Sequence, residues 1–277
     1  MNPSLSFDLL SDIRQLLAFP FMMHALEAAT IVAVMAGVVG WYMVLRRQSF
    51  AGHTLSVMAF PGATGAALAG VPTALGYYVA CAAAALAIGG ARRTSGGESA
   101  AIGTVQATGL AAGFLFLSLN HAVLSGLETL LFGNILGVSA GQVLALAGVA
   151  VGVLVVLALA ARPLLFATID RDVARASGVP VGILDLVFLL VLGLAVAATS
   201  QITGALLVFA LLVAPAAAAQ VLSTRPLVSL ALSVAFALMI AWLGLGIAYF
   251  SIYPVGFYIT SFAFGLYLLA RLARALF

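Results

Sequence analysis

Long apolar runs constrain the fold of this 277-residue chain more than any other feature of its sequence. One of them, VLALAGVAVGVLVVLALAA at 143–161, contains no charged residue and is apolar on every side. A membrane-spanning helix needs about 20 predominantly apolar residues, whereas a spanning β-strand alternates apolar with polar residues. Because 65% of the chain is apolar and only 7% is charged, runs of this kind fill most of it. The sequence therefore predicts an all-α, polytopic transmembrane helical bundle.

We expect about nine spans, or eight if the first or second is re-entrant, in a single transmembrane domain that covers residues 1–277. The expected spans are 24–45, 53–70, 73–91, 102–119, 141–161, 184–200, 202–222, 227–248 and 255–272. Pro61 and its glycine neighbours predict that the second span is broken or kinked. The sixth and seventh form one block that is too long for a single crossing, so we divide it near Ser200, Gln201 and Thr203. The residues before Pro20 predict a short interfacial helix.

The basic residues give the expected orientation. All eleven are arginine, and with nine spans ten of them fall on one side of the membrane; Arg14 is the exception. Cytoplasmic loops of membrane proteins carry an excess of Lys and Arg. The sequence therefore predicts an N-terminus outside and a C-terminus in the cytoplasm. Because the net charge of +3 is spread thinly at span ends, it is a topology signal, and no nucleic-acid partner is expected.

The residue inventory argues against a catalytic role for the chain. It contains no lysine, so the phosphate-binding motif G-x-x-x-x-G-K-[ST] cannot be written in it. No Ser-His-Asp or H-E-x-x-H arrangement occurs, and the single cysteine excludes an internal disulfide. We therefore expect no enzymatic site and no permanently bound cofactor, and any ATP that the protein uses is hydrolysed by a separate partner protein.

Charges of both signs gather in only one place in the middle of the chain, the stretch 162–185. Charged groups of this density must lie in water or against a polar partner, since they are expensive within a membrane. The predicted topology puts the stretch in the cytoplasm, where we expect a helix that docks on another protein. Gly178, followed by Pro180, predicts the end of that helix.

Five stretches resemble, in order, the permease subunit of the ATP-binding-cassette (ABC) importers for zinc, manganese and iron. They are RRQSFAGHTLSVMAFPGA (46–63), GESAAIGTVQA (97–107), LETLLFGNILGVSAGQ (127–142), DRDVARASGVPVGILD (170–185) and QITGALLVFALLVAPAAAA (201–219). The resemblance implies a type II importer permease fold in a bacterial cytoplasmic membrane. It also implies a homodimer, two cytoplasmic ABC ATPase subunits beneath it, and an extracytoplasmic metal-binding protein that delivers a divalent ion.

The resemblance places the coupling helix of this family, which contacts the ATPase, at about 170–180. Such a helix needs charged groups for pairing and small or apolar groups for close packing. The candidate coupling residues are Asp170, Arg171, Asp172, Val173, Ala174, Arg175, Ala176, Ser177 and Gly178.

The resemblance also points to a metal position after the first span, where the family usually reads Gly-Asp-x-x-Ser-His. This chain reads Gly-His-Thr-Leu-Ser-Val at 52–57, so His53 replaces the acid and Val57 replaces the histidine. A neutral imidazole binds zinc, manganese and iron, and Met58 could add a thioether. His53 and Met58 are therefore the candidate metal ligands, while a hydrogen-bonded histidine near the membrane edge and a core methionine are the alternatives.

Further residues are candidates for the gate and the pathway. We expect the connection 120–142 to form part of an outer gate, with Glu128 in it. Ser56 and Pro61 match the family pattern, Gln201 lies at an outer turn, and Pro215 should kink the seventh span.

Three other functions stay open at this point. A permease for iron chelates or cobalamin has a similar coupling segment, and the altered metal motif is compatible with one. An ion-coupled secondary transporter would need central intramembrane acids, which this chain almost lacks. A membrane scaffold without transport activity would purify without any ATPase.

Overall fold

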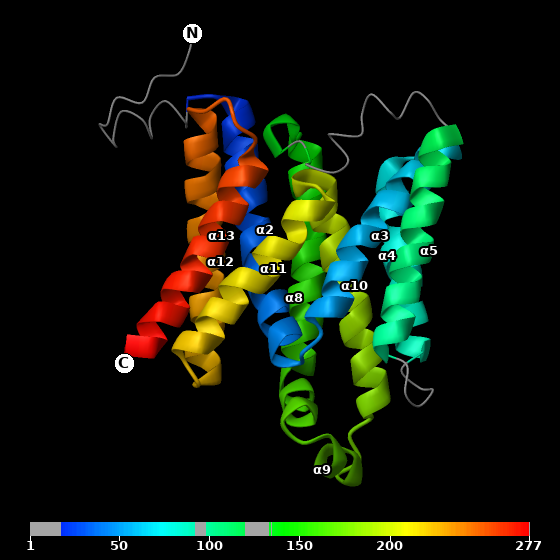
Figure 1. Ribbon diagram of the computed structural model, residues 1–277, viewed down its shortest axis with the longest axis vertical. Helices are drawn as coiled ribbons and strands as arrows, with labels where there is room; N and C mark the ends of the chain where they lie inside the picture. The colour runs from blue at the N-terminus through cyan, green and yellow to red at the C-terminus, as the bar shows by residue number, and fades with distance from the viewer. Residues whose placement is uncertain (1–17, 92–97, 120–132, 134, 277) are drawn as a thin grey trace.

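The computed structural model describes residues 18–91, 98–119, 133 and 135–276, and this part of the chain contains helices and no strand (Figure 1). Its long helices are α2 (Pro20–Leu45), α3 (Ser49–Leu68), α4 (Thr73–Ala91), α5 (Glu98–Leu119), α8 (Ala140–Ile169), α10 (Val181–Thr203), α11 (Ala205–Leu222), α12 (Pro226–Tyr249) and α13 (Val255–Leu276). Two short elements join them, the 3-10 helix η1 (Ile135–Gly137) and the six-residue helix α9 (Arg171–Ala176). The all-α prediction is confirmed, and the expected interfacial helix before Pro20 lies outside the described residues.

A helix occupies each of the nine predicted positions. Among the described residues, seven helices are long and apolar enough to cross a membrane, and α3 and α11 are not among these seven. Several ends differ from the prediction. The first helix begins at Pro20 because proline fits the first turn, where no N–H is required. The fifth predicted span, α8, extends beyond its predicted end at 161. It continues to Ile169, with Arg162 and Pro163 inside the helix.

Three helices, α3, α4 and α5, form one side of the molecule and lie to the right in Figure 1. Gly62 of α3 and Gly76 of α4 face each other so closely that a Cβ added to either would overlap the carbonyl oxygen of the other. Small residues at such crossings let backbones approach and gain van der Waals contact without a hydrophobic driving force. This close crossing joins α3 and α4.

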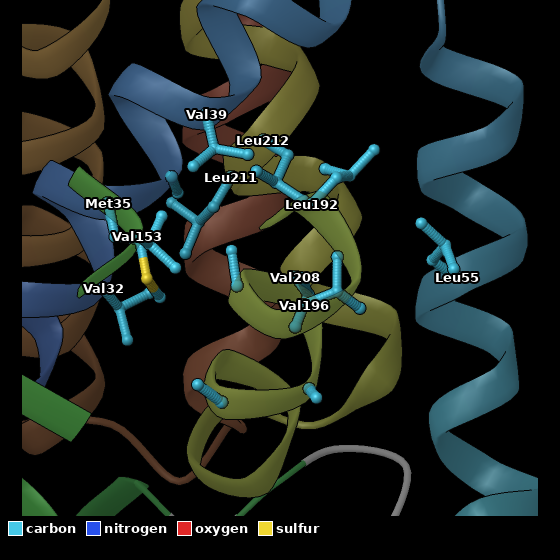
Figure 2. Close-up of a cluster of buried hydrophobic side chains, with 14 of the residues drawn as sticks. Val32, Met35, Val39, Leu55, Val153, Leu192, Val196, Val208, Leu211 and Leu212 are labelled. Carbon is cyan, nitrogen blue, oxygen red and sulfur yellow. The ribbon is translucent and has the colours of Figure 1, made fainter. Parts of the chain in front are cut away.

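The centre of the molecule is an apolar core between α2, α8, α10 and α11. Figure 2 shows side chains from these helices packed together, while Leu55 on α3 stands at the edge of the group. Polar side chains add interhelical hydrogen bonds on the far side of α2. The Trp41 Nε1–H donates to Ser229 Oγ at 3.0 Å, and the Ser233 hydroxyl donates to the Gly37 carbonyl at 2.7 Å, so α12 is fixed against α2.

The predicted division between the sixth and seventh spans is confirmed at Gly204, which separates α10 from α11. Its φ of 79° is left-handed, a conformation that glycine adopts without strain. The second span was predicted to be broken or kinked. It is not broken, because α3 is continuous from Ser49 to Leu68 with Pro61 inside it, and it packs against α4 and α5. The helix α11 likewise continues through Pro215.

The helix ends that carry arginine gather at one end of the molecule. The α2–α3 turn, α9, the α11–α12 turn and the C-terminus all lie toward the bottom of Figure 1, while the start of α2 lies at the top. This grouping is what the alternation of arginine-rich turns predicts for a bundle of antiparallel helices.

Candidate functional site

The short helix α9 stands beyond the bundle, at the lower end of Figure 1. The Asp170 side chain caps its start by accepting hydrogen bonds from the backbone N–H groups of Asp172 at 3.1 Å and Val173 at 3.0 Å. Its end is a Schellman motif, in which the Gly178 N–H donates to Arg175 and the Val179 N–H to Ala174, both at 3.0 Å. Gly178 has a left-handed φ of 84°, so the predicted helix end is confirmed.

The surface of α9 divides into an inner residue and an outer face. Ala174 is fully buried in a small cluster with Ala167 at the end of α8 and Val181 at the start of α10. The other residues from Arg171 to Gly178 are exposed. Asp172 and Arg175 pair with each other at 3.6 Å on this outer face. The outer face therefore combines one charged pair with the exposed side chains of Val173, Ala176 and Ser177.

An ion-pair network holds α9 against the bundle. The carboxylate of Asp185, in the first turns of α10, pairs with both Arg46 at the end of α2 and Arg171 at the start of α9. The sequence marked Arg171 as a coupling residue and did not predict this network. The signal that could have found it is that all three charges adjoin predicted spans at the same end of the bundle.

The candidate metal ligand His53 lies on α3 and faces α11. Its ring contacts Phe209 edge-on, with the two ring centroids 4.8 Å apart. The His53 Nδ1 atom is buried and has no hydrogen-bond partner among the described residues. A buried ring nitrogen without a partner is energetically unfavourable unless something else binds it. This nitrogen is therefore available to a ligand.

Met58 and His53 do not converge. The Met58 sulfur lies against Gly109 of α5, in direct contact with the position that a Cβ there would take, whereas His53 faces α11. Ser56 is buried, and its hydroxyl donates to the His53 carbonyl within α3 at 2.7 Å. Pro61 is also buried and packs against Gly113 of α5. Among the described candidates His53, Met58, Ser56 and Pro61, only His53 has a buried side-chain nitrogen without a hydrogen-bond partner.

The predicted gate and pathway residues do not form one group, since Ser56 and Pro61 lie within α3, Pro215 within α11 and Gln201 near the end of α10. Gln201 donates to the Ala197 carbonyl at 3.2 Å and borders a cavity of about 50 Å³ together with Tyr78 and Gln142. From the connection 120–142, Gly133 packs directly against the Thr203–Gly204 break, and η1 lies against α2. Pro215 is buried in α11. Glu128 lies outside the described residues.

Within one chain, the described residues do not form a metal centre. They contain no group of three or more His, Cys, Asp and Glu side chains that could hold a metal ion. A hollow of about 360 Å³ lies between α11 and α13, with Phe209 in its wall, but its lining is almost entirely apolar. An apolar wall cannot replace the water shell of a cation. Any ion site at His53 therefore needs further ligands.

Comparison with known proteins places these features in a family. The ABC 3 transport family matches residues 18–274. The chain is 34% identical over 239 residues to the manganese transport system membrane protein MntC of Halalkalibacterium halodurans, which covers 86% of this chain and 81% of that one. It is 32% identical over 208 residues to the chelated iron transport system membrane protein YfeC of Yersinia pestis, with 75% and 70% covered.

A solved structure has the same fold. The similar chain is from PsaBC of Streptococcus pneumoniae in complex with Fab, with a TM-score of 0.84 and 28% identity over 95% of both chains. The likeness extends over nearly the whole length, so it includes the helices on either side of α9 and the helix that carries His53.

Proposed function

Because the chain belongs to the ABC 3 transport family, the permease subunits of metal-ion ABC importers, we propose that it carries a divalent metal ion inward across the bacterial cytoplasmic membrane. Two copies form the pathway, and an extracytoplasmic metal-binding protein delivers the ion to it. Manganese is the first candidate cargo, with zinc and iron as alternatives, and the name of the similar MntC protein supports this order.

The exposed face of α9 is the contact for the ATPase subunits in this proposal. Capping at both ends stabilises a helix too short to persist in isolation, and a stable shape is what a docking surface requires. Val173, Ala176 and Ser177 pack into a cleft of the ATPase, while Asp172 and Arg175 pair with its charged groups. When ATP draws the two ATPases together, both α9 helices follow, and the outer ends of the bundle rearrange.

The orientation in the membrane follows from the arginine-rich end. We place that end in the cytoplasm, with nine spans, the N-terminus outside and a type II importer arrangement. The outer gate then lies where Gly133 packs against the break between α10 and α11, because that junction is at the end of α10 away from α9. The small cavity beside Gln201 is also lined by Ile202, two residues before the break.

The observation that carries the metal proposal is the unpartnered Nδ1 of His53, on the helix where this family places its intramembrane ligands. In a homodimer, the two-fold axis brings a second His53 to the pathway. Two imidazoles and no carboxylate make a weakly charged site, through which an ion can pass without being held tightly.

A second candidate function is import of chelated iron, which the name of the Yersinia pestis relative supports. The cargo differs in size and charge, so competition distinguishes the two. Excess chelator abolishes uptake of a bare ion and leaves uptake of a chelate intact. The family match favours ATP-driven transport over the ion-coupled alternative.

The direct test is metal uptake in cells that express the complete transport system. His53→Ala is expected to reduce uptake of the cargo ion about tenfold at limiting metal, a loss that corresponds to about 1.4 kcal/mol of binding. Met58→Leu is the matched control and should transport normally, since Met58 packs against α5. Unchanged uptake of manganese, zinc and iron by His53→Ala would remove His53 as a ligand.

A further inference from the structure

Asp185 is a charged residue buried where three segments of the chain meet. It is 7% exposed and lies near the start of α10. Its Oδ1 accepts from Arg46 at the end of α2, and its Oδ2 accepts from Arg171 at the start of α9. One carboxylate thus joins the membrane-embedded bundle to the helix that projects from it.

Arg46 also binds α8, so the network includes a further helix. Its side chain is only 4% exposed, and its guanidinium donates to Thr168 Oγ1 of α8 at 3.1 Å and to the Leu164 carbonyl at 3.5 Å. The guanidinium carbon also lies 5.2 Å from the centre of the Phe188 ring of α10, within cation–π range. The lower ends of α2, α8 and α10 are consequently held by one side chain.

Arg46 is also close to the helix that carries His53. The α2–α3 turn is tight: Arg47 has a left-handed φ of 55°, and the Gln48 N–H donates to the Met43 carbonyl at 2.9 Å. The helix α3 begins directly afterwards at Ser49. A displacement of Arg46 therefore reaches the start of α3 through three residues of constrained backbone.

The contacts that α9 makes with the bundle are few. Within the described residues, and apart from its chain connections, α9 is held by Ala174 in the small apolar cluster and by the ion pair between Arg171 and Asp185. Arg171 is half exposed, whereas its partner is buried. If Arg171 leaves, Asp185 still has Arg46 as a partner, so the fold tolerates the loss. The pair nevertheless favours one position of α9 relative to α2 and α10, because it is the ion pair between α9 and the buried carboxylate.

We propose that Asp185, Arg46 and Arg171 are positioning residues that transmit the movement of α9 to the α2–α3 turn and so to the pathway helix. This inference rests on the proposed function, in which α9 contacts the ATPase. The three residues touch neither ATP nor the ion. They set how strongly a movement of α9 affects the bundle, because packed side chains and ion-pair networks carry energetic coupling between distant elements.

The experiment uses the complete complex of permease and ATPase in proteoliposomes, with ATP hydrolysis and manganese uptake measured in the same sample. The guanidinium of Arg171 pairs with the buried Asp185, so the proposed contacts with the ATPase are those of Asp172, Val173, Arg175, Ala176 and Ser177 and do not include Arg171. Arg171→Gln should therefore leave copurification of the ATPase and the rate of hydrolysis within about twofold of wild type, while uptake per ATP falls about tenfold, equivalent to about 1.4 kcal/mol of coupling. Arg171→Lys keeps the charge and should restore most of the coupling. Arg162→Gln removes an exposed arginine of α8 that lies outside the network and should behave as wild type.

Asp185→Asn removes the shared carboxylate and should uncouple at least as strongly as Arg171→Gln; combining the two should add little. If Asp185→Asn lowers the yield of folded complex, the test rests on Arg171→Gln, since the Arg171 side chain is half exposed and its loss should not impair folding. Wild-type uptake per ATP in Arg171→Gln overturns the inference and leaves the proposed function intact. A wild-type complex that hydrolyses ATP without moving manganese, zinc or iron contradicts the proposed function itself.

Discussion

His53 combines a ring that packs against an aromatic neighbour with a buried ring nitrogen. Its Nδ1 is buried without a partner in the described part of the chain, and its ring is held edge-on by Phe209. A fixed ring with an available nitrogen is pre-organised for a ligand, because little side-chain freedom is lost when the ligand binds. Phe209 is therefore the neighbour that sets the direction of the imidazole.

The crossing of Gly62 and Gly76 leads to a prediction about stability. In Gly76→Val the new side chain would overlap the Gly62 carbonyl, so α3 and α4 must separate, and overpacking of this kind costs about 1–3 kcal/mol. We expect a clear fall in the melting temperature of the purified protein in detergent. Gly90→Val is the matched control on the same helix, since a Cβ at Gly90 meets nothing within 4 Å. Equal melting temperatures for the two variants would contradict the close crossing.

At the scale of single elements, α9 depends on its caps. Gly178→Ala places a Cβ on a residue with a φ of 84°, which costs about 1–2 kcal/mol although the surroundings are open. We expect weaker stimulation of the ATPase by the permease, with normal expression. Gly182→Ala at the start of α10 is the control, because its surroundings are equally open and its φ is ordinary. Full stimulation by Gly178→Ala would show that the cap is dispensable.

A charge reversal at Arg175 tests the outer face of α9 without changing the caps that hold the helix. Arg175→Glu reverses a charge that is exposed and paired only locally with Asp172, so the fold should tolerate it. Transport and stimulation of the ATPase should both fall by about tenfold or more, since like charges across a contact oppose binding. Arg162→Glu provides the charge-matched comparison on α8. Normal stimulation by Arg175→Glu would contradict the assignment of α9 as the ATPase contact.

The positions of the helices were predictable from the sequence, because each needs a long apolar run that few other structures can use. The ends of the helices were harder to predict. Helix α8, for example, continues past Arg162 to Ile169, and arginine is a good helix former. The ion pair of Arg46 with Asp185 was not predicted, because the two residues are 139 positions apart and the shared end of the bundle was the only sequence signal for it. Sequence reasoning placed both charges at the same end, but contact between them depends on how α2 and α10 pack.

At the scale of the whole molecule, the arginine-rich end predicts a testable topology. The single cysteine, Cys81, is fully buried, so a cysteine introduced at an exposed site reacts almost alone. Ile252→Cys, in the α12–α13 turn, should react with an impermeant thiol reagent added outside intact cells. Thr224→Cys, in the α11–α12 turn, should react only after the membrane is opened. The reverse pattern would invert the proposed orientation.

The length of α8 has a mechanical consequence. Its 30 residues extend about 45 Å, whereas the hydrocarbon core of a bilayer is about 30 Å thick, so one end must project. A rigid rod of that length that tilts by about 10° about one end moves its other end by about 8 Å. If the pivot lies near the outer end, α8 acts as a lever. A small change in the tilt of α8 at its outer end and a large displacement of α9 are then two parts of one motion.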